Sequence, residues 1–88
     1  MTLPLNYAML KYFTKVDRAS VEDVLKELKP QYSNHKAFKK KSMIEALMTA
    51  KENGLIDENG FELINDELVV YYSASQEQKD TINKYIKD

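Results

Sequence analysis

A chain of 88 residues is long enough for one domain and too short for two. Hydrophobic residues make up 43% of it, above the level typical of disordered chains, and the absence of cysteine excludes disulfides and thiolate metal sites. The formal net charge of −1 is unevenly distributed: residues 1–41 carry nine basic and four acidic side chains, a net of +5, and residues 42–88 carry four basic and ten acidic ones, a net of −6. We expect a single domain over residues 1–88 with opposite charge on its two halves.

The N-terminus, Met1-Thr2-Leu3-Pro4, has no basic region followed by an apolar run, so it does not look like a signal peptide. No stretch approaches the roughly 20 apolar residues that span a bilayer. We therefore expect no membrane contact and a cytoplasmic location.

The first helix is predicted over about residues 5–16. Its apolar stripe has spacings of four, four and three residues, which places one helix face on a core. The stripe consists of Leu5, Met9, Phe13 and Val16. Pro4 suits the start of this helix because proline is tolerated at a helix N-terminus.

The second helix is predicted over about residues 20–29. Ser20 offers an N-cap, and Glu22 and Asp23 place negative charge in the first turn, where the helix dipole favours it. Apolar residues then follow at i, i+3, i+4 and i+7, namely Val21, Val24, Leu25 and Leu28. Pro30 is predicted to end the helix because it lacks a donor and disfavours the α conformation of the residue before it.

A connector precedes the third helix, which is predicted over about residues 37–53. Ser42 and Glu45 suit a capping box that would start the helix at Ser42; the alternative is a longer helix that starts near Asn34. Asn53-Gly54 is a typical helix stop. The apolar stripe by which this third helix would face the core consists of Met43, Leu47 and Ala50.

The periodicity then changes to that of strands. Asn59-Gly60 is a turn signal, and two runs rich in β-formers follow, Phe61–Ile64 and Leu68–Tyr72. Asn65-Asp66-Glu67 between them suits a tight turn, so we expect a hairpin over about residues 61–72.

A last helix is predicted over about residues 76–87. Ser75 and Gln78 suit a second capping box. Ile82, Tyr85 and Ile86 give this helix one apolar side. The whole chain is thus expected to be α+β and mostly α.

Residues 42–56, reading SMIEALMTAKENGLI, resemble the third helix and exit turn of a winged helix-turn-helix domain. In that family a polar residue opens the segment, small and apolar residues recur at helical spacing, and a polar pair precedes Gly-Leu-Ile. Residues 18–25 resemble the family's short first strand and capped second helix, and Phe61–Tyr72 would be its wing. The resemblance covers about residues 5–73 and implies three helices, a β-hairpin wing and here an extra C-terminal helix. The connector before the third helix is longer than the family's usual tight turn.

The resemblance implies a DNA-binding, transcription-regulator-like protein whose third helix enters the major groove of double-stranded DNA. The local charge agrees, because no acidic residue lies between Leu28 and Ile44 and lysines would neutralise phosphates. The predicted nucleic-acid-binding residues are Lys36, Lys39, Lys40, Lys41 and Ser42. The alternative is an ordinary solvated, lysine-rich face.

The hairpin argues against DNA. It holds five carboxylates with no basic residue between Lys51 and Lys79, and these would repel a line of phosphates. They are Asp57, Glu58, Glu62, Asp66 and Glu67. Glu45, on the presumed recognition helix, adds to the repulsion.

A protein-binding surface is the alternative function. Ile44 and Met48 widen the apolar face of the third helix beyond its core stripe. We favour a broad buried face for them, covered by the first or the last helix, over a surface for a partner. Tyr71, Tyr72 and Tyr85 present the same choice, and only one of Tyr71 and Tyr72 should be core because alternate strand residues face opposite sides.

Catalysis is not expected. His35 is the single histidine, and its neighbours Asn34 and Lys36 fit a surface or capping role. No Ser-His-Asp order, HExxH motif or Gly-rich phosphate loop is present, so we expect no enzyme, metal, cofactor or small-molecule ligand.

Three hypotheses follow for the partner. The first is double-stranded DNA, bound with a steep salt dependence, by a protein that dimerises through its last helix. The second is another protein, bound through Ile44, Met48 and a hairpin tyrosine. The third is a second copy of the chain, whose basic end would dock on the acidic hairpin.

Overall fold

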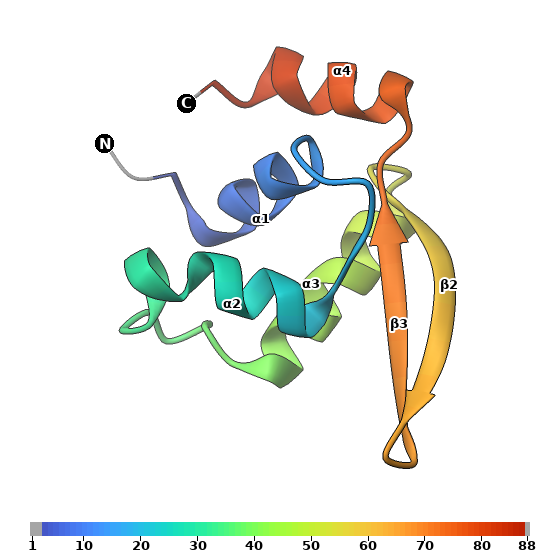
Figure 1. Cartoon of the computed structure of the whole chain (residues 1–88). Coiled ribbons are helices and arrows are strands. Elements are labelled where there is room, and N and C mark those ends of the chain that lie inside the picture. The colour runs from blue at the N-terminus through green and yellow to red at the C-terminus, as the bar shows by residue number, and fades with distance from the viewer. Residues whose placement is uncertain (1–2, 88) are drawn as a thin grey trace.

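The computed structural model describes residues 3–87, so the predicted range of 1–88 begins and ends outside the described residues. Residues 3–87 form four helices and a three-stranded antiparallel sheet, a small α+β fold (Figure 1). The elements are α1 Leu5–Phe13, β1 Ala19–Ser20, α2 Val21–Tyr32, α3 Lys40–Glu52, β2 Asp57–Ile64, β3 Glu67–Ser73 and α4 Gln76–Tyr85.

α1 starts at Leu5 as predicted but ends at Phe13 rather than at Val16. Thr14 closes it, because both its Oγ1 and its backbone N–H donate to the carbonyl of Lys11, at 2.6 and 3.0 Å. These bonds reach back three residues and tighten the last turn. Val16 still packs against the core, from the loop that follows the helix.

α2 has the predicted cap. Ser20 Oγ accepts from the Asp23 N–H at 3.4 Å, and Asp23 Oδ2 accepts from the Ser20 N–H at 2.9 Å, which completes a capping box. The prediction that Pro30 ends the helix is wrong, since α2 continues to Tyr32. Pro30 lies in the last turn, where it removes one donor, and the buried Tyr32 holds that turn by donating its hydroxyl hydrogen to the Leu3 carbonyl.

α3 starts at neither predicted place. Its first residue is Lys40 and its N-cap is Lys39, with no side-chain cap bond, and Ser42 lies inside the first turn. The connector before it is held by local bonds instead: the Phe38 N–H donates to the His35 carbonyl at 3.0 Å, and the Ala37 N–H donates to His35 Nδ1 at 3.1 Å. His35 therefore caps a turn, as one of the two roles predicted for it.

The end of α3 is as predicted. Gly54 takes a φ of 77°, a left-handed conformation that suits glycine. The Leu55 N–H donates to the Ala50 carbonyl and the Gly54 N–H to the Lys51 carbonyl, at 2.9 and 3.0 Å, which is the Schellman pattern.

β3 is the middle strand of the sheet, in the order β1-β3-β2. β2 and β3 are joined by Asn65 and Asp66, whose φ angles of 52° and 66° fit a two-residue turn of type I′. The hairpin is longer than predicted because β2 starts at Asp57, before the expected turn at Asn59-Gly60. Pairing is irregular between Glu58 and Phe61, so those glycine and asparagine residues form a bulge within the strand.

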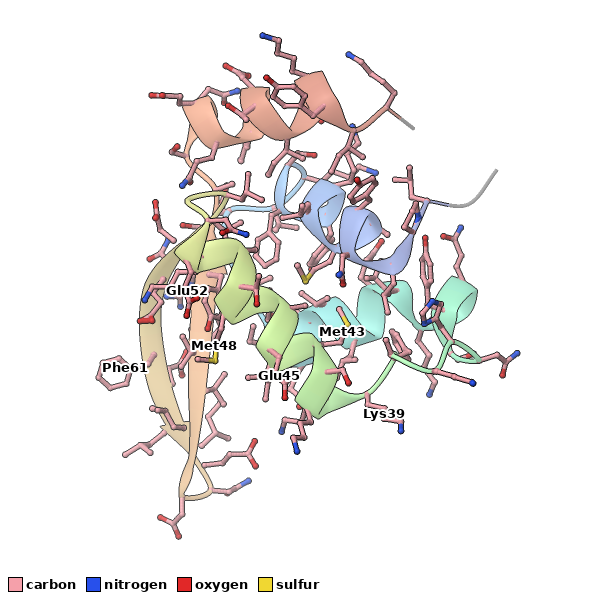
Figure 2. All side chains as sticks on the ribbon, turned by 180° about the vertical axis from the view of Figure 1, so that it is seen from behind. Lys39, Met43, Glu45, Met48, Glu52 and Phe61 are labelled. Atoms are coloured by element: carbon pink, nitrogen blue, oxygen red, sulfur yellow. The ribbon has the colours of Figure 1, made fainter. Side chains whose placement is uncertain are left out.

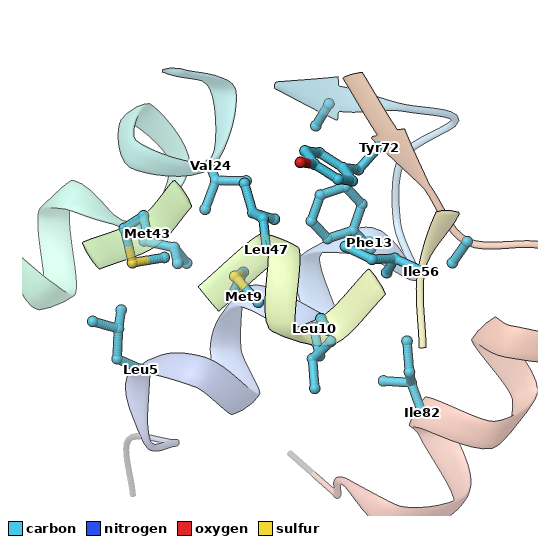
Figure 3. Packing of buried hydrophobic residues seen from close by; sticks show 14 of the residues in the cluster. Leu5, Met9, Leu10, Phe13, Val24, Met43, Leu47, Ile56, Tyr72 and Ile82 are labelled. Carbon is cyan, nitrogen blue, oxygen red and sulfur yellow. The ribbon is translucent and has the colours of Figure 1, made fainter. Parts of the chain in front are cut away.

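The core lies where the helices meet the inner side of β3 (Figure 3). Its largest fully buried side chains come from α1, α2, α3 and the entry to β2, and they are Phe13, Met9, Met43, Leu47, Ile56 and Val24. Tyr72 is buried with them, whereas Tyr71 is only half-buried, so one of the two tyrosines is core as predicted.

α4 lies beside α1, at the end of the molecule away from the hairpin turn (Figure 1). The predicted capping box forms, with Ser75 Oγ accepting from the Gln78 N–H at 3.1 Å and Gln78 Oε1 from the Ser75 N–H at 2.8 Å. Ile82 and Ile86 are buried, and Lys11 of α1 donates to Asn83 Oδ1 at 2.8 Å. The helix ends at Tyr85, short of the predicted residue 87.

The orientation of α3, with Leu47 buried and Met48 exposed, can be tested by measuring the stability of variants at these two positions. Leu47→Ala removes a side chain that is 1% exposed and should lower the free energy of unfolding by about 2–5 kcal/mol. Met48→Ala, one residue on and 48% exposed, should cost less than about 1 kcal/mol. Urea denaturation of both variants measures the difference, and equal costs would contradict this orientation of α3.

Candidate interaction surface at the third helix and the hairpin

The predicted basic segment is exposed at Lys36, Lys39, Lys40 and Lys41, and Ser42 is half-buried. Lys40 is engaged within the molecule: its Nζ lies 2.9 Å from Glu22 Oε1 of α2 and 2.9 Å from Glu67 Oε1 of β3. Two carboxylates and one ammonium leave a local charge of −1. The hairpin thus places negative charge beside the centre of the basic segment.

Two further carboxylates of the hairpin meet cations. Glu58 Oε2 lies 3.6 Å from Lys51 Nζ of α3, and Glu62 Oε1 lies 3.9 Å from Arg18 Nη2. Each pair is exposed, so each adds little to stability, but together they join the acidic hairpin to α3 and to the loop before β1.

Ile44 and Met48 are 37% and 48% exposed. The favoured interpretation that α1 or α4 covers them is wrong. The buried stripe of Met43, Leu47 and Ala50 fixes the rotation of α3 and turns Ile44 and Met48 toward the hairpin instead. Figure 2 shows Met48 beside the hairpin strands, with Lys39 at the far end of the helix and Glu45 and Glu52 along its exposed side.

A groove of about 200 Å³ opens between α3, the first turn of α2 and the hairpin. It is lined by Val21, Glu22, Lys40, Ile44, Leu47, Met48, Glu67, Leu68, Val69, Val70 and Tyr72. The buried Leu47 and Tyr72 form its floor, and the Lys40 bridge stands at one end. The groove is smaller than the roughly 300–1,000 Å³ of typical small-molecule sites, so its size suits one large side chain.

An exposed apolar strip continues from the groove across the hairpin. The register pairs Phe61 with Val70 and Leu63 with Leu68, and paired residues of an antiparallel ladder project from the same side of the sheet. Phe61 and Leu63 are 69% and 73% exposed. Exposed apolar side chains gathered in this way are typical of binding surfaces.

The structure separates the predicted protein-interaction residues. Ile44, Met48 and Tyr72 meet at the groove, although Tyr72 lies in its floor. Tyr71 faces the other side of the sheet, where the Arg18 guanidinium carbon lies 4.1 Å from its ring centroid. Tyr85 is on α4, away from the groove.

The two tyrosines of β3 both have a raised pKa, for different reasons. A hydrogen bond with Glu62, followed by desolvation, raises the pKa of Tyr71. Desolvation, followed by the charge of Glu58, raises the pKa of Tyr72. Both therefore stay neutral in the physiological range and present apolar rings with a polar tip.

The sequence analysis missed the strand side of this surface. Leu68 and Val70 line the groove, and Phe61 and Leu63 extend it, yet none was predicted as a site residue. The signal was the alternation Phe61-Glu62-Leu63, which marks one apolar face of an edge strand. Glu22 was assigned to the helix dipole alone, although it also binds Lys40.

Within residues 3–87, no group of three or more His, Cys, Asp or Glu side chains is placed to hold a metal ion. No helix in that range combines the length and the apolar character needed to cross a membrane.

The Lys40 bridge makes a titration prediction. Its hydrogen bond with Glu67, and then that with Glu22, raises the pKa of Lys40 above the ordinary lysine value of 10.5. A raised folded-state pKa means that this contribution to stability is complete below the unfolded-state pKa and is lost as the pH rises through the folded one. In ¹³C NMR titrations of the Lys40 Cε, Glu67→Gln should lower the midpoint.

Glu45→Gln is the matched control, because it removes a carboxylate from α3 outside the groove lining. It should leave the Lys40 midpoint close to that of the natural chain. An unchanged midpoint in Glu67→Gln would show that the bridge does not form in solution.

No family model, curated protein or solved structure matches the chain. The groove, its ion pairs and the apolar strip are the observations that bear on its function.

Proposed function

We propose that the chain is a winged-helix-like domain that binds a protein partner through the groove between α3 and the hairpin. The order of the elements supports the winged-helix assignment: a two-residue strand precedes a capped second helix, and a hairpin follows the third helix. In such a domain α3 takes the place of the recognition helix and β2–β3 that of the wing.

The exposure of Ile44 and Met48 carries the proposal. A helix that enters a major groove reads base edges through hydrogen-bonding side chains. The outward side of α3 instead offers two apolar side chains at a groove with a buried apolar floor. Partially exposed apolar side chains around a desolvated pocket are typical of protein–protein contacts.

Electrostatics point the same way. Glu45 and Glu52 are exposed on α3, and the hairpin that would lie beside a duplex holds five carboxylates. Lys40, which would contact phosphate, is already bound to Glu22 and Glu67. A duplex that approached α3 would meet repulsion along most of its contact.

DNA binding is the second candidate, and the basic segment favours it. Lys36, Lys39 and Lys41 are exposed near the start of α3, and no acidic residue lies between Leu28 and Ile44. This candidate requires the duplex to contact the first turn of α3 and to avoid the hairpin.

The test combines two measurements on the full chain. Immobilised wild-type protein and Thr49→Asp should retain one and the same protein from an extract of the source cells, and Met48→Asp should not, because a carboxylate in the groove wall opposes burial of an apolar side chain. Thr49→Asp adds the same charge to the same helix at an exposed position outside the groove lining.

The second measurement is of DNA binding, by fluorescence anisotropy with a long duplex at low salt. We expect no association at protein concentrations where the retained partner binds. Salt-sensitive duplex binding that Lys39→Ala and Lys41→Ala weaken would favour DNA as the partner. If Met48→Asp retains the same protein as the wild type, the groove is not the binding surface.

A further inference from the structure

The groove between α3 and the hairpin has the size of one side chain and an apolar floor, and the charged residues that line it, Glu22, Lys40 and Glu67, carry a net charge of −1. An occupant that fits all three is a large side chain with a cation close to it. Lys40 contacts Oε1 of Glu22 and Oε1 of Glu67, and each carboxylate has further lone pairs that accept from a second cation. Met48 in the wall adds a flexible thioether, which packs well against an aromatic ring.

The chain itself exposes few aromatic side chains of this kind. Within residues 3–87 the strongly exposed ones are Tyr7, Phe61 and Tyr85. Phe61 belongs to the apolar strip that continues from the groove, so it is part of the receiving surface, and Tyr7, at 49%, is the least exposed of the three. Tyr85 is the most exposed, at 74%.

Tyr85 also has the complementary charge. Lys84 and Lys87 flank it, residues 82–87 hold no carboxylate, and Lys84 Nζ lies 5.7 Å from the centroid of its ring. α4 ends at Tyr85, so the ring stands at an open helix end where another molecule can reach it. Tyrosine is enriched at interface cores because a rigid apolar ring carries a polar tip.

We infer that a second copy of the chain occupies the groove, with Tyr85 of one copy inserted between Ile44, Met48 and Leu68 of the other and its flanking lysines beside Glu22 and Glu67. The inference rests on the proposed function, since it names the partner of the same groove. Tyr85 and the groove come from different parts of the surface, so the contact joins unlike patches. Two copies can satisfy it twice by exchanging their Tyr85 side chains, or further copies can add head to tail.

The contact is small, so self-association is expected in the micromolar to millimolar range and should weaken with salt, since it pairs exposed charges. Sedimentation equilibrium should show a mass above that of one chain as the concentration rises. Tyr85→Ser and Met48→Asp should each raise the dissociation constant about tenfold or more, as for loss of an interface anchor. Thr49→Asp, at an exposed position outside the groove lining, should leave it unchanged.

A mixture of Tyr85→Ser and Met48→Asp chains provides the sharpest arm, because the first keeps an intact groove and the second an intact Tyr85. The mixture should associate more strongly than either variant alone, which simple misfolding of one variant would not produce. In ¹³C-methyl spectra the Met48 signal should shift with concentration while those of the buried Met9 and Met43 stay in place.

A constant mass and a concentration-independent Met48 signal up to millimolar protein would overturn the inference, as would association that Tyr85→Ser does not weaken. The proposed function can hold when this inference fails. If Met48→Asp abolishes retention of a different protein while the chain stays monomeric, the groove binds a partner that is not a second copy.

Discussion

The rotation of α3 about its own axis is the constraint on which the rest of the surface depends. Three buried residues, Met43, Leu47 and Ala50, lie on one stripe and meet side chains from α1, α2 and β3. Because only one such stripe of a helix can face the core, the side chains that are buried determine which of the others are exposed to solvent or to a partner. The rotation that buries Leu47 also turns Ile44 and Met48 toward the hairpin and brings Lys40 within reach of Glu22 and Glu67.

Much of the fold was predictable because local chemistry agrees with tertiary packing. Ser20 and Ser75 cap their helices, Gly54 ends α3, and Asn65-Asp66 turns the hairpin, each at the residue that the sequence indicated. Predictions failed where packing overrides local preference. Pro30 was predicted to end α2, yet the helix continues to Tyr32, whose side chain is buried in the core. α3 starts at Lys40, without the side-chain cap that Ser42 suggested.

The candidate surface was harder to predict for a geometric reason. Periodicity identified Ile44 and Met48 as extra apolar residues on α3, but it cannot tell whether another element covers them. That depends on where β3 lies, and the strand side of the groove, Leu68 and Val70, follows only from the register. The charge split of the sequence was visible as +5 and −6, but its contacts between Arg18 and Glu62 and between Lys40 and Glu67 join residues 44 and 27 positions apart.

Leu47 and Tyr72 belong at once to the core and to the floor of the groove. Replacing either residue by a smaller side chain would open a cavity under the helices, and replacing it by a larger one would strain the core. The depth of the groove is therefore fixed by the requirement to fold. Ile44, Met48 and Leu68 carry no such requirement, because they stand partly in solvent. Relatives of this domain that differ in binding preference would diverge at these wall positions and keep the same floor.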